Sequence, residues 1–250
     1  YYEISLEINP EYVEAYNNLG NILSELGDTN KAIKSFNDAI AIQPNYADAH
    51  NNLGNSYLAL GQLNKAVNSY ENAILYKADY AEAHNNLGIV MYKLGQFDLA
   101  VKYYKTAQKF KSDYADSHAN LGVVFKDLNR FDEALISYEK AFKLNSKLDF
   151  ILGDLLYTRM HLCIWDDLQA LLSEVENRIN KQEKVINPFP LLALIDDPEI
   201  QLKAAKIFIN ERYPVNNTFS KIAHYSNHKK IRIGYFSADF RDHPVSNLTA

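Results

Sequence analysis

The stretch Asn51-Asn52-Leu53-Gly54 returns along the chain at a fixed interval of 34 residues. Its other copies are Asn17-Asn18-Leu19-Gly20, Asn85-Asn86-Leu87-Gly88 and Ala119-Asn120-Leu121-Gly122. A fixed period of this length is typical of repeat proteins, in which one small helical unit is stacked on the next. The sequence therefore predicts a mainly α-helical solenoid with repeats over residues 13–46, 47–80, 81–114 and 115–148.

Small and aromatic residues recur at matching positions of the four repeats. The eighth position is always glycine and the twenty-fourth is always aromatic; the pairs are Gly20 with Phe36, Gly54 with Tyr70, Gly88 with Tyr104, and Gly122 with Tyr138. Glycine allows two helices to approach closely, and a ring fills the space beside them. A second set, Gly27, Gly61, Gly95 and Asn129, follows the first helical segment of each repeat. Because these residues adopt left-handed backbone conformations easily, they predict that each repeat is a pair of antiparallel helices.

The remaining segments depart from the full repeat. Residues 1–12 match the second helix of a repeat whose first helix is missing, and residues 149–213 read as a helical cap and connecting region in which Pro188 and Pro190 break the chain. Residues 214–228 are polar and predict a linker. Residues 229–250 contain a short β-rich run, 231–236, followed by a polar loop and a helix start, which is typical of the opening of an α/β domain.

Composition limits the classes of function. The net charge of −5 argues against a general nucleic-acid or anionic-membrane binder, because such proteins depend on basic surfaces. The single cysteine, Cys163, cannot form an internal disulfide, so we expect a reducing, cytoplasmic location. No apolar run reaches the length of a membrane span, and no partner membrane is expected.

An unbroken series of asparagines marks the sixth position of every repeat: Asn18, Asn52, Asn86 and Asn120. On a helical wheel this position lies opposite the packing residues, so the series should line the inner surface of the solenoid. A carboxamide both donates and accepts hydrogen bonds and can pair with any peptide backbone. The series therefore predicts a groove for extended peptides, to which the neighbouring Asn17, Asn51 and Asn85 contribute.

An alternative is that these amides only bridge neighbouring helices, as many partly buried amides do. The two interpretations predict different results when Asn52 and Asn86 are changed to Ala. Binding should weaken at a nearly unchanged melting temperature if the amides bind peptide, whereas a loss of several degrees would indicate bridging.

Two other series recur with the same period. His50, His84 and His118 lie on the packing side, where we expect core residues rather than a metal site. Glu14, Asp48, Glu82 and Asp116 occupy the second position. Carboxylates there favour the positive end of a helix, and they would also give the groove an acidic lip.

The small-large-small pattern over residues 13–148 resembles the tetratricopeptide repeat, which implies a right-handed solenoid. The likeness extends further along the chain. The asparagine series, the connecting stretch 187–194 with Asp196-Asp197-Pro198, and residues 231–244 together resemble the protein O-linked N-acetylglucosamine transferases, especially their bacterial relatives.

This resemblance implies a parent enzyme with two Rossmann-like lobes that transfers N-acetylglucosamine from UDP-GlcNAc to Ser or Thr of intracellular proteins held in the repeat groove. A related architecture serves O-fucosyltransferases, which use GDP-fucose. The resemblance leaves open whether the repeats of this chain form a homodimer. No cofactor is expected in the 250-residue chain itself.

The resemblance matches the family's His-Pro motif to His243-Pro244, whereas a second histidine of some members is Asn247 here. A histidine after the first parallel strand lies where open α/β sheets place ligands, and it can act as a base or a donor. Capping of the next helix is an alternative role. No phosphate-binding glycine loop accompanies it, so we expect the chain alone to be inactive as a transferase. A rival hypothesis is a non-enzymatic scaffold that docks the extended tail of a partner protein.

Overall fold

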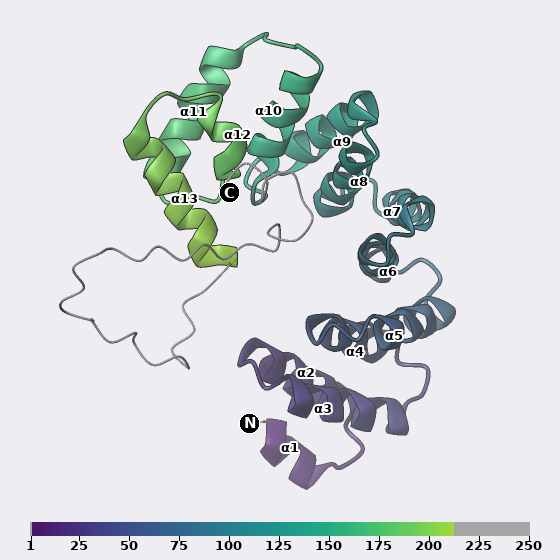
Figure 1. Cartoon of the computed structure of the whole chain (residues 1–250). Helices are drawn as coiled ribbons and strands as arrows, with labels where there is room; N and C mark the ends of the chain where they lie inside the picture. The colour runs from purple at the N-terminus through teal and green to yellow at the C-terminus, as the bar shows by residue number, and fades with distance from the viewer. Residues whose placement is uncertain (1, 213–250) are drawn as a thin grey trace, which may run out of the picture. The chain divides into compact units, whose positions relative to one another are not determined.

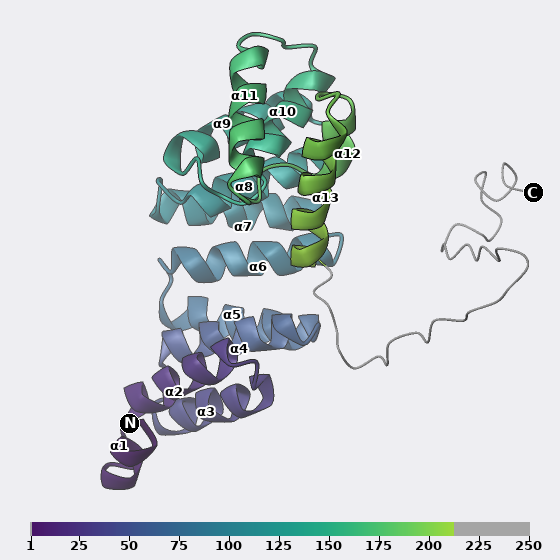
Figure 2. The ribbon, with the colours of Figure 1, turned by 90° about the vertical axis from the view of Figure 1, so that its left-hand side faces the viewer.

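The structure, a computed structural model, describes residues 2–212, and within this range every regular element is an α-helix. The predicted α-helical solenoid is confirmed. The first helices of the repeats are α2 (Val13–Glu25), α4 (Ala47–Ala59), α6 (Ala81–Lys93) and α8 (Ala115–Asp127). The second helices are α3 (Thr29–Ile42), α5 (Leu63–Tyr76), α7 (Phe97–Phe110) and α9 (Phe131–Leu144). Figures 1 and 2 show these pairs stacked in chain order, with α1 (Tyr2–Ile8) packed on α2.

The glycine at the eighth position accommodates the aromatic ring of the same repeat. A Cβ atom added to Gly54 would lie 2.6 Å from Cε1 of Tyr70, and one added to Gly122 would lie 2.6 Å from Cε1 of Tyr138. These distances are too short for any side chain, so the ring takes the space that glycine leaves. The predicted close packing of glycine on an aromatic ring is confirmed.

Each first helix of the repeats ends in a left-handed residue. The φ angles are +82° at Gly27, +69° at Gly61, +73° at Gly95 and +58° at Asn129. After α4 the reversed backbone lets Gln62 N–H donate to the carbonyl of Tyr57 at 2.9 Å, which satisfies a carbonyl in the last turn of the helix. The turn residues predicted from the sequence therefore direct the chain into the second helix.

Helix α10 (Ile151–His161) joins two apolar cores. Ile151 and Leu155 complete the core that runs through the later repeats, whereas Leu152 and Leu156 belong to a second core formed with the following helices. A helix that is apolar on opposite faces is buried on both. The helix therefore covers the open end of α9, as the predicted cap required, and supports the elements that follow.

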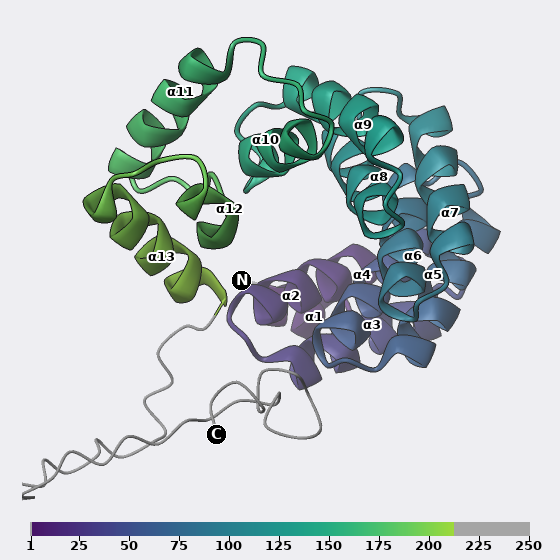
Figure 3. The ribbon, with the colours of Figure 1, turned by 45° about the horizontal axis from the view of Figure 1, so that its top comes forward.

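The second core is enclosed by α11 (Leu168–Asn180), α12 (Pro188–Leu192) and α13 (Pro198–Arg212). Figure 3 shows α12 and α11 beside α13. We expected Pro188 and Pro190 to break the chain before a short apolar turn, but Pro188 instead lies inside a regular element. It opens the short helix α12, because proline is well suited to a first helical position and Asn187 caps the helix by accepting a hydrogen bond from Phe189 N–H at 3.2 Å.

An extended segment before α12 lies directly on α10. Phe150 N–H donates to the carbonyl of Lys184 at 2.7 Å, and Gly153 N–H donates to that of Val185 at 3.0 Å. A Cβ atom on Gly153 would lie 2.6 Å from the Cα atom of Ile186. The absence of a side chain at residue 153 is therefore what lets the two backbones meet.

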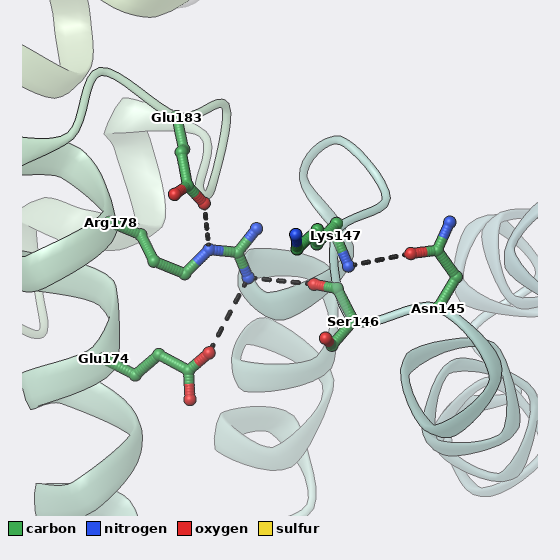
Figure 4. A network of polar contacts seen from close by, with 6 residues as sticks. All are labelled: Asn145, Ser146, Lys147, Glu174, Arg178 and Glu183. Atoms are coloured by element: carbon green, nitrogen blue, oxygen red, sulfur yellow. Dashed lines mark hydrogen bonds and ion pairs between the residues drawn. The ribbon is translucent and has the colours of Figure 1, made fainter.

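Arg178 fastens α11 to the turn that follows the last repeat (Figure 4). Its Nε donates to Glu183 at 2.7 Å, its Nη1 donates to the carbonyl of Ser146 at 2.9 Å, and Glu174 lies 3.9 Å away. The arginine is buried, whereas the side chains of Glu174 and Glu183 are 44% and 40% exposed. One side chain thus holds both the helix and the turn.

The predicted linker 214–228, the strand 231–236 and His243 lie outside the described residues. In the part that is described, none of the helices combines the length and the apolar character that crossing a bilayer requires.

Candidate functional site

The asparagines at the fifth and sixth positions recur in register, and hydrogen bonds join pairs of them between successive repeats; we call the set the asparagine ladder. It comprises Asn17, Asn18, Asn51, Asn52, Asn85, Asn86 and Asn120. At each step the amide of a sixth-position residue donates to the carboxamide oxygen of the fifth-position residue one repeat earlier. The bonds are Asn52 to Asn17 at 3.0 Å, Asn86 to Asn51 at 3.1 Å and Asn120 to Asn85 at 3.1 Å.

The two positions of the ladder differ in exposure. The fifth-position residues are buried, with exposed fractions of 6% for Asn17, 5% for Asn51 and 3% for Asn85. The sixth-position residues are half-buried. The bridging interpretation is therefore confirmed for the amide nitrogen of the sixth-position side chains, and the fifth-position residues serve as its buried acceptors.

Two of the three bridging sixth-position residues, Asn52 and Asn120, keep a free side-chain oxygen, and within residues 2–212 the side chain of Asn18 forms no hydrogen bond. Within residues 2–212, the carboxamide oxygens of Asn52 and Asn120 accept no hydrogen bond and are not enclosed. Asn86 differs, because its amide also donates to Asn55 at 3.1 Å and its oxygen lies 3.5 Å from the amide of Asn85. Because the bridge orients each amide, the free oxygens of Asn52 and Asn120 are fixed acceptors for donors outside the solenoid.

The residue at the ninth position, one helical turn after the ladder, changes character along the solenoid. It is Asn21 and Asn55 in the first two repeats but Ile89 and Val123 in the last two. Asn55 accepts a hydrogen bond from the hydroxyl of Tyr70 at 2.8 Å. The surface beside the ladder is thus polar at its N-terminal end and aliphatic at its C-terminal end.

Carboxylates and tyrosines alternate at the start of the first helices. Burial raises the pKa of Tyr80, and a hydrogen bond to Asp48 raises it further. Burial likewise raises the pKa of Tyr114 to about 12, with the charges of Asp116 and Glu82 adding to the rise. Partial burial alone would raise the pKa of Glu82, but its backbone hydrogen bond and Lys111, 3.1 Å away, outweigh burial and lower it. The acidic residues therefore interact with groups of the solenoid itself, in addition to lying at helix starts.

The histidine series is structural. His50 Nε2 lies 2.9 Å from the carbonyl of Pro44, His84 Nε2 lies 3.0 Å from that of Ala78, and His118 Nε2 repeats the contact with the residue six positions earlier. A ring N–H that donates to a carbonyl secures the turn between repeats. Within residues 2–212, no three His, Cys, Asp or Glu side chains come together as a metal site would require.

A pocket of about 470 Å³ opens where the solenoid meets its C-terminal helices. We call it the junction pocket. Its wall includes four aromatic side chains, Phe150, Tyr157, Phe189 and Phe208, and the ion pair of Lys126 and Asp154 at 2.9 Å. Val123 also lines it, one turn after Asn120 on α8. A second, more open hollow has Asn120 on its wall and shares Asp149 with the junction pocket. The last residue of the ladder therefore lies next to the junction pocket.

Comparison with known protein families shows which family of repeat proteins the chain belongs to. The TPR repeat family matches residues 20–61 and 54–95, and Tetratricopeptide repeat families match residues 1–34 and 79–147. Together with the stacked helix pairs, these matches show that the chain belongs to the tetratricopeptide-repeat proteins.

Individual relatives share only parts of the chain. Over 109 residues it is 28% identical to the probable UDP-N-acetylglucosamine--peptide N-acetylglucosaminyltransferase SEC of Arabidopsis thaliana. That match covers 38% of this chain and 11% of the plant protein, so the chain spans a small part of its relative's length.

Two solved structures show the same fold. PilF of Pseudomonas aeruginosa aligns with a TM-score of 0.65 and 21% identity, covering 82% of this chain and 93% of PilF. YrrB, described as a TPR protein with an unusual peptide-binding site, aligns with a TM-score of 0.56 and 18% identity, covering 82% of this chain and 97% of YrrB.

Sequence reasoning found the ladder but missed the junction pocket. The ladder repeats with the period of the solenoid and can be read directly. The aromatic residues of the pocket are distributed between Phe150 and Phe208 with no period. The pair Phe189-Pro190, in the connecting stretch that the sequence singled out, was a local signal, but it did not indicate a pocket. His243, the predicted catalytic residue, lies outside the described part of the chain.

Proposed function

We propose that the asparagine ladder binds extended segments of partner proteins through their backbone. The observation that carries this proposal is the pair of oriented, unpartnered carboxamide oxygens on Asn52 and Asn120. A backbone N–H is the donor that every extended segment supplies, whatever its side chains. Packed helices are spaced by roughly 10 Å and an extended chain rises about 3.3 Å per residue, so one ladder residue meets about every third residue of the segment.

The partner segments belong, in this proposal, to acceptor proteins of a protein O-glycosyltransferase. The parent enzyme transfers N-acetylglucosamine from UDP-GlcNAc to Ser or Thr, and this chain is its acceptor-binding arm. The partial similarity to the plant transferase supports this assignment. An O-fucosyltransferase-type parent would use the same arm with a different sugar donor.

The peptide-binding role is tested by two matched double variants. Asn52→Ala with Asn120→Ala removes the free oxygens together with the bridges. Asn17→Ala with Asn85→Ala removes the same two bridges from their buried side and leaves the groove-facing residues in place. The probe is a fluorescein-labelled, unstructured 20-residue peptide of Ser, Thr, Gly and Ala, and the readout is fluorescence anisotropy well below the melting temperature.

We expect the Asn52/Asn120 variant to bind about tenfold more weakly than the unchanged chain, because it loses two hydrogen bonds of about 0.5–1.5 kcal/mol each. The Asn17/Asn85 variant keeps both oxygens but loses the bridges that orient them, so we expect it to lose some affinity but less than the Asn52/Asn120 variant. Equal losses in the two variants, or no loss in either, would exclude recognition by the free oxygens.

A non-enzymatic scaffold is the second candidate, and the fold similarity to YrrB along most of both chains favours it. Both candidates use the same groove. They are separated by incubating the natural full-length protein with UDP-GlcNAc and an acceptor peptide and measuring the peptide mass. Addition of one N-acetylhexosamine supports the transferase, and binding without transfer supports the scaffold. The 250-residue chain alone is expected to transfer nothing.

A further inference from the structure

We propose that the junction pocket receives one aromatic side chain of the bound segment and thereby sets the register of that segment on the ladder. The inference rests on the proposed peptide-binding function and adds to it a side-chain specificity that the asparagines cannot supply.

The chemistry of the pocket favours an aromatic occupant. The rings of Phe150 and Phe208 meet edge to face with their centroids 5.9 Å apart, and the guanidinium of Arg212 lies 5.9 Å from the centre of the Phe208 ring. Aromatic rings attract one another in such offset or edge-on arrangements beyond the effect of area alone. The volume of about 470 Å³ accommodates a ring together with its backbone.

Phe189 is held in place but left uncovered. Its exposed fraction is 79%, although the next residues of the same short helix include the fully buried Leu191. Asn187 caps the helix and accepts from the N–H of Phe189, which fixes the backbone at this point. A large ring on a fixed backbone at the mouth of an aromatic pocket gains buried area when a ligand ring enters.

The pocket continues the ladder. Val123 lies three residues after Asn120, on the same face of α8, and it lines the pocket. The hollow beside Asn120 shares Asp149 with the pocket. The replacement of Asn21 and Asn55 by Ile89 and Val123 makes the surface aliphatic toward this end. A segment held by the ladder therefore reaches the pocket without leaving the solenoid surface.

A periodic ladder has no means of fixing register. The free oxygens of Asn52 and Asn120 are chemically equivalent, so a given backbone N–H of the segment can pair with either of them. The junction pocket occurs at one place and has no counterpart with the 34-residue period in its aromatic residues. One aromatic side chain in this pocket breaks the equivalence and selects a single register.

The experiment uses the 250-residue chain and three fluorescein-labelled 16-residue peptides of Ser, Thr, Gly and Ala. One contains Phe at position 2, one contains Phe at position 15, and one contains no aromatic residue. We expect one of the two Phe peptides to bind about tenfold more tightly than the third, since the ladder and the pocket are engaged together in one orientation.

Two variants of α12 locate the effect. Phe189→Ala should abolish the advantage of the Phe peptide. Leu192→Ala, at a residue of the same helix that is 58% exposed and does not line the pocket, should preserve it. Both residues are largely exposed, so neither change should disturb folding.

A photoreactive benzoylphenylalanine in place of the Phe gives a direct readout of register. Cross-links to α8, α10, α12 or α13 support the proposal, and cross-links spread over the earlier repeats overturn it. An undiminished Phe advantage in Phe189→Ala, or no advantage at all, overturns it too. Failure of the general proposal is recognised separately, because the peptide without an aromatic residue would then bind equally well to the Asn52/Asn120 variant.

Discussion

The side-chain amide of Asn52 donates a hydrogen bond to the carboxamide oxygen of Asn17, 3.0 Å away and 35 residues earlier in the chain. The contact joins the first helices of two successive repeats and uses only the nitrogen of Asn52. One type of side chain therefore has two roles, because an amide can hold the neighbouring repeat with its donor while its acceptor faces outward. The same division recurs at Asn120.

Replacement of Asn86 by Ala should lower stability. Asn51 is 5% exposed and accepts from Asn86, so the change leaves a buried carboxamide oxygen without its donor. We expect a loss of about 1 kcal/mol and a fall in melting temperature of about 2–4 °C. The bridges therefore predict a fall in melting temperature, whereas the peptide-binding interpretation of the sequence predicted nearly none.

The measurement for the Asn86 variant is thermal unfolding followed by circular dichroism. Asn68→Ala is the control, because Asn68 is exposed on α5 and, within the described range, its side chain forms no hydrogen bond. Equal melting temperatures for Asn86→Ala and the unchanged chain would contradict the bridging role.

Replacement of Gly122 by Ala should disrupt the last repeat. The new Cβ would lie 2.6 Å from the ring of Tyr138, which is fully buried and has little room to move. Overpacking of this kind costs about 1–3 kcal/mol. Adding Tyr138→Leu to Gly122→Ala should cost less than the sum of the two single changes, since the smaller side chain relieves the overlap. Urea unfolding of the four proteins measures the coupling, and strict additivity would exclude the predicted clash.

The stability of the last repeat should depend on pH through His118. Burial lowers the pKa of this imidazole. The bond to the Ser112 carbonyl raises the pKa by less than burial lowers it, and the charge of Lys140 also lowers it. The folded state therefore binds a proton less readily than the unfolded state, whose histidine has a pKa near 6.5. The stabilising contribution is complete above about pH 6.5 and is lost as the pH falls below that value.

The matched variant for this effect is His118→Tyr, because Tyr16 occupies the same position in the first repeat. We expect the melting temperature to fall less between pH 7.5 and pH 5.5 in this variant than in the unchanged chain. The other histidines contribute equally to both proteins. A fall of the same size in both would show that His118 does not contribute.

Replacement of Arg178 by Met should loosen the C-terminal helices from the solenoid. Arg178 is buried and donates to Glu183 and to the carbonyl of Ser146, and the methionine keeps its bulk but not its donors. Ser146 is exposed, so water can replace the lost donor at its carbonyl, and we expect a cost of about 1 kcal/mol. Lys206→Met is the control, because Lys206 is exposed on α13 and, within residues 2–212, its side chain forms no hydrogen bond or ion pair. The rate of amide hydrogen exchange in α11 measures the loosening. Equal exchange rates in the two variants would argue against the proposed role of Arg178 in holding α11 to the solenoid.

The repeat architecture could be read almost entirely from the sequence. The packing of Gly54 on Tyr70 and the left-handed Asn129 both follow from local patterns that return every 34 residues, and each contact partner is only a few turns away in the chain. In a periodic sequence the same residue pair occurs in all four repeats. Such a recurrence indicates a structural contact rather than a chance coincidence of two residues.

The sequence did not show that the amide nitrogen and the oxygen of one ladder side chain have different roles. Sequence placed Asn52 and Asn86 on the inner surface but left bridging and binding as alternatives. Only the structure shows that the amide nitrogens bridge to Asn17 and Asn51. The orientation of a carboxamide depends on its neighbours in three dimensions, which the identity of the residue does not specify.

By itself, the sequence determined the helix pairs, the turns between them, the glycine contacts and the position of the asparagines, because each depends on residues within one or two repeats. The tertiary structure alone decided what lies at the C-terminal end. Gly153 lies against Ile186, and Arg178 reaches Ser146, across separations with no repeating pattern. The junction pocket likewise brings Val123 near Phe208. Such contacts follow from how α10 to α13 pack around a second core. No periodic pattern in the sequence predicts that packing.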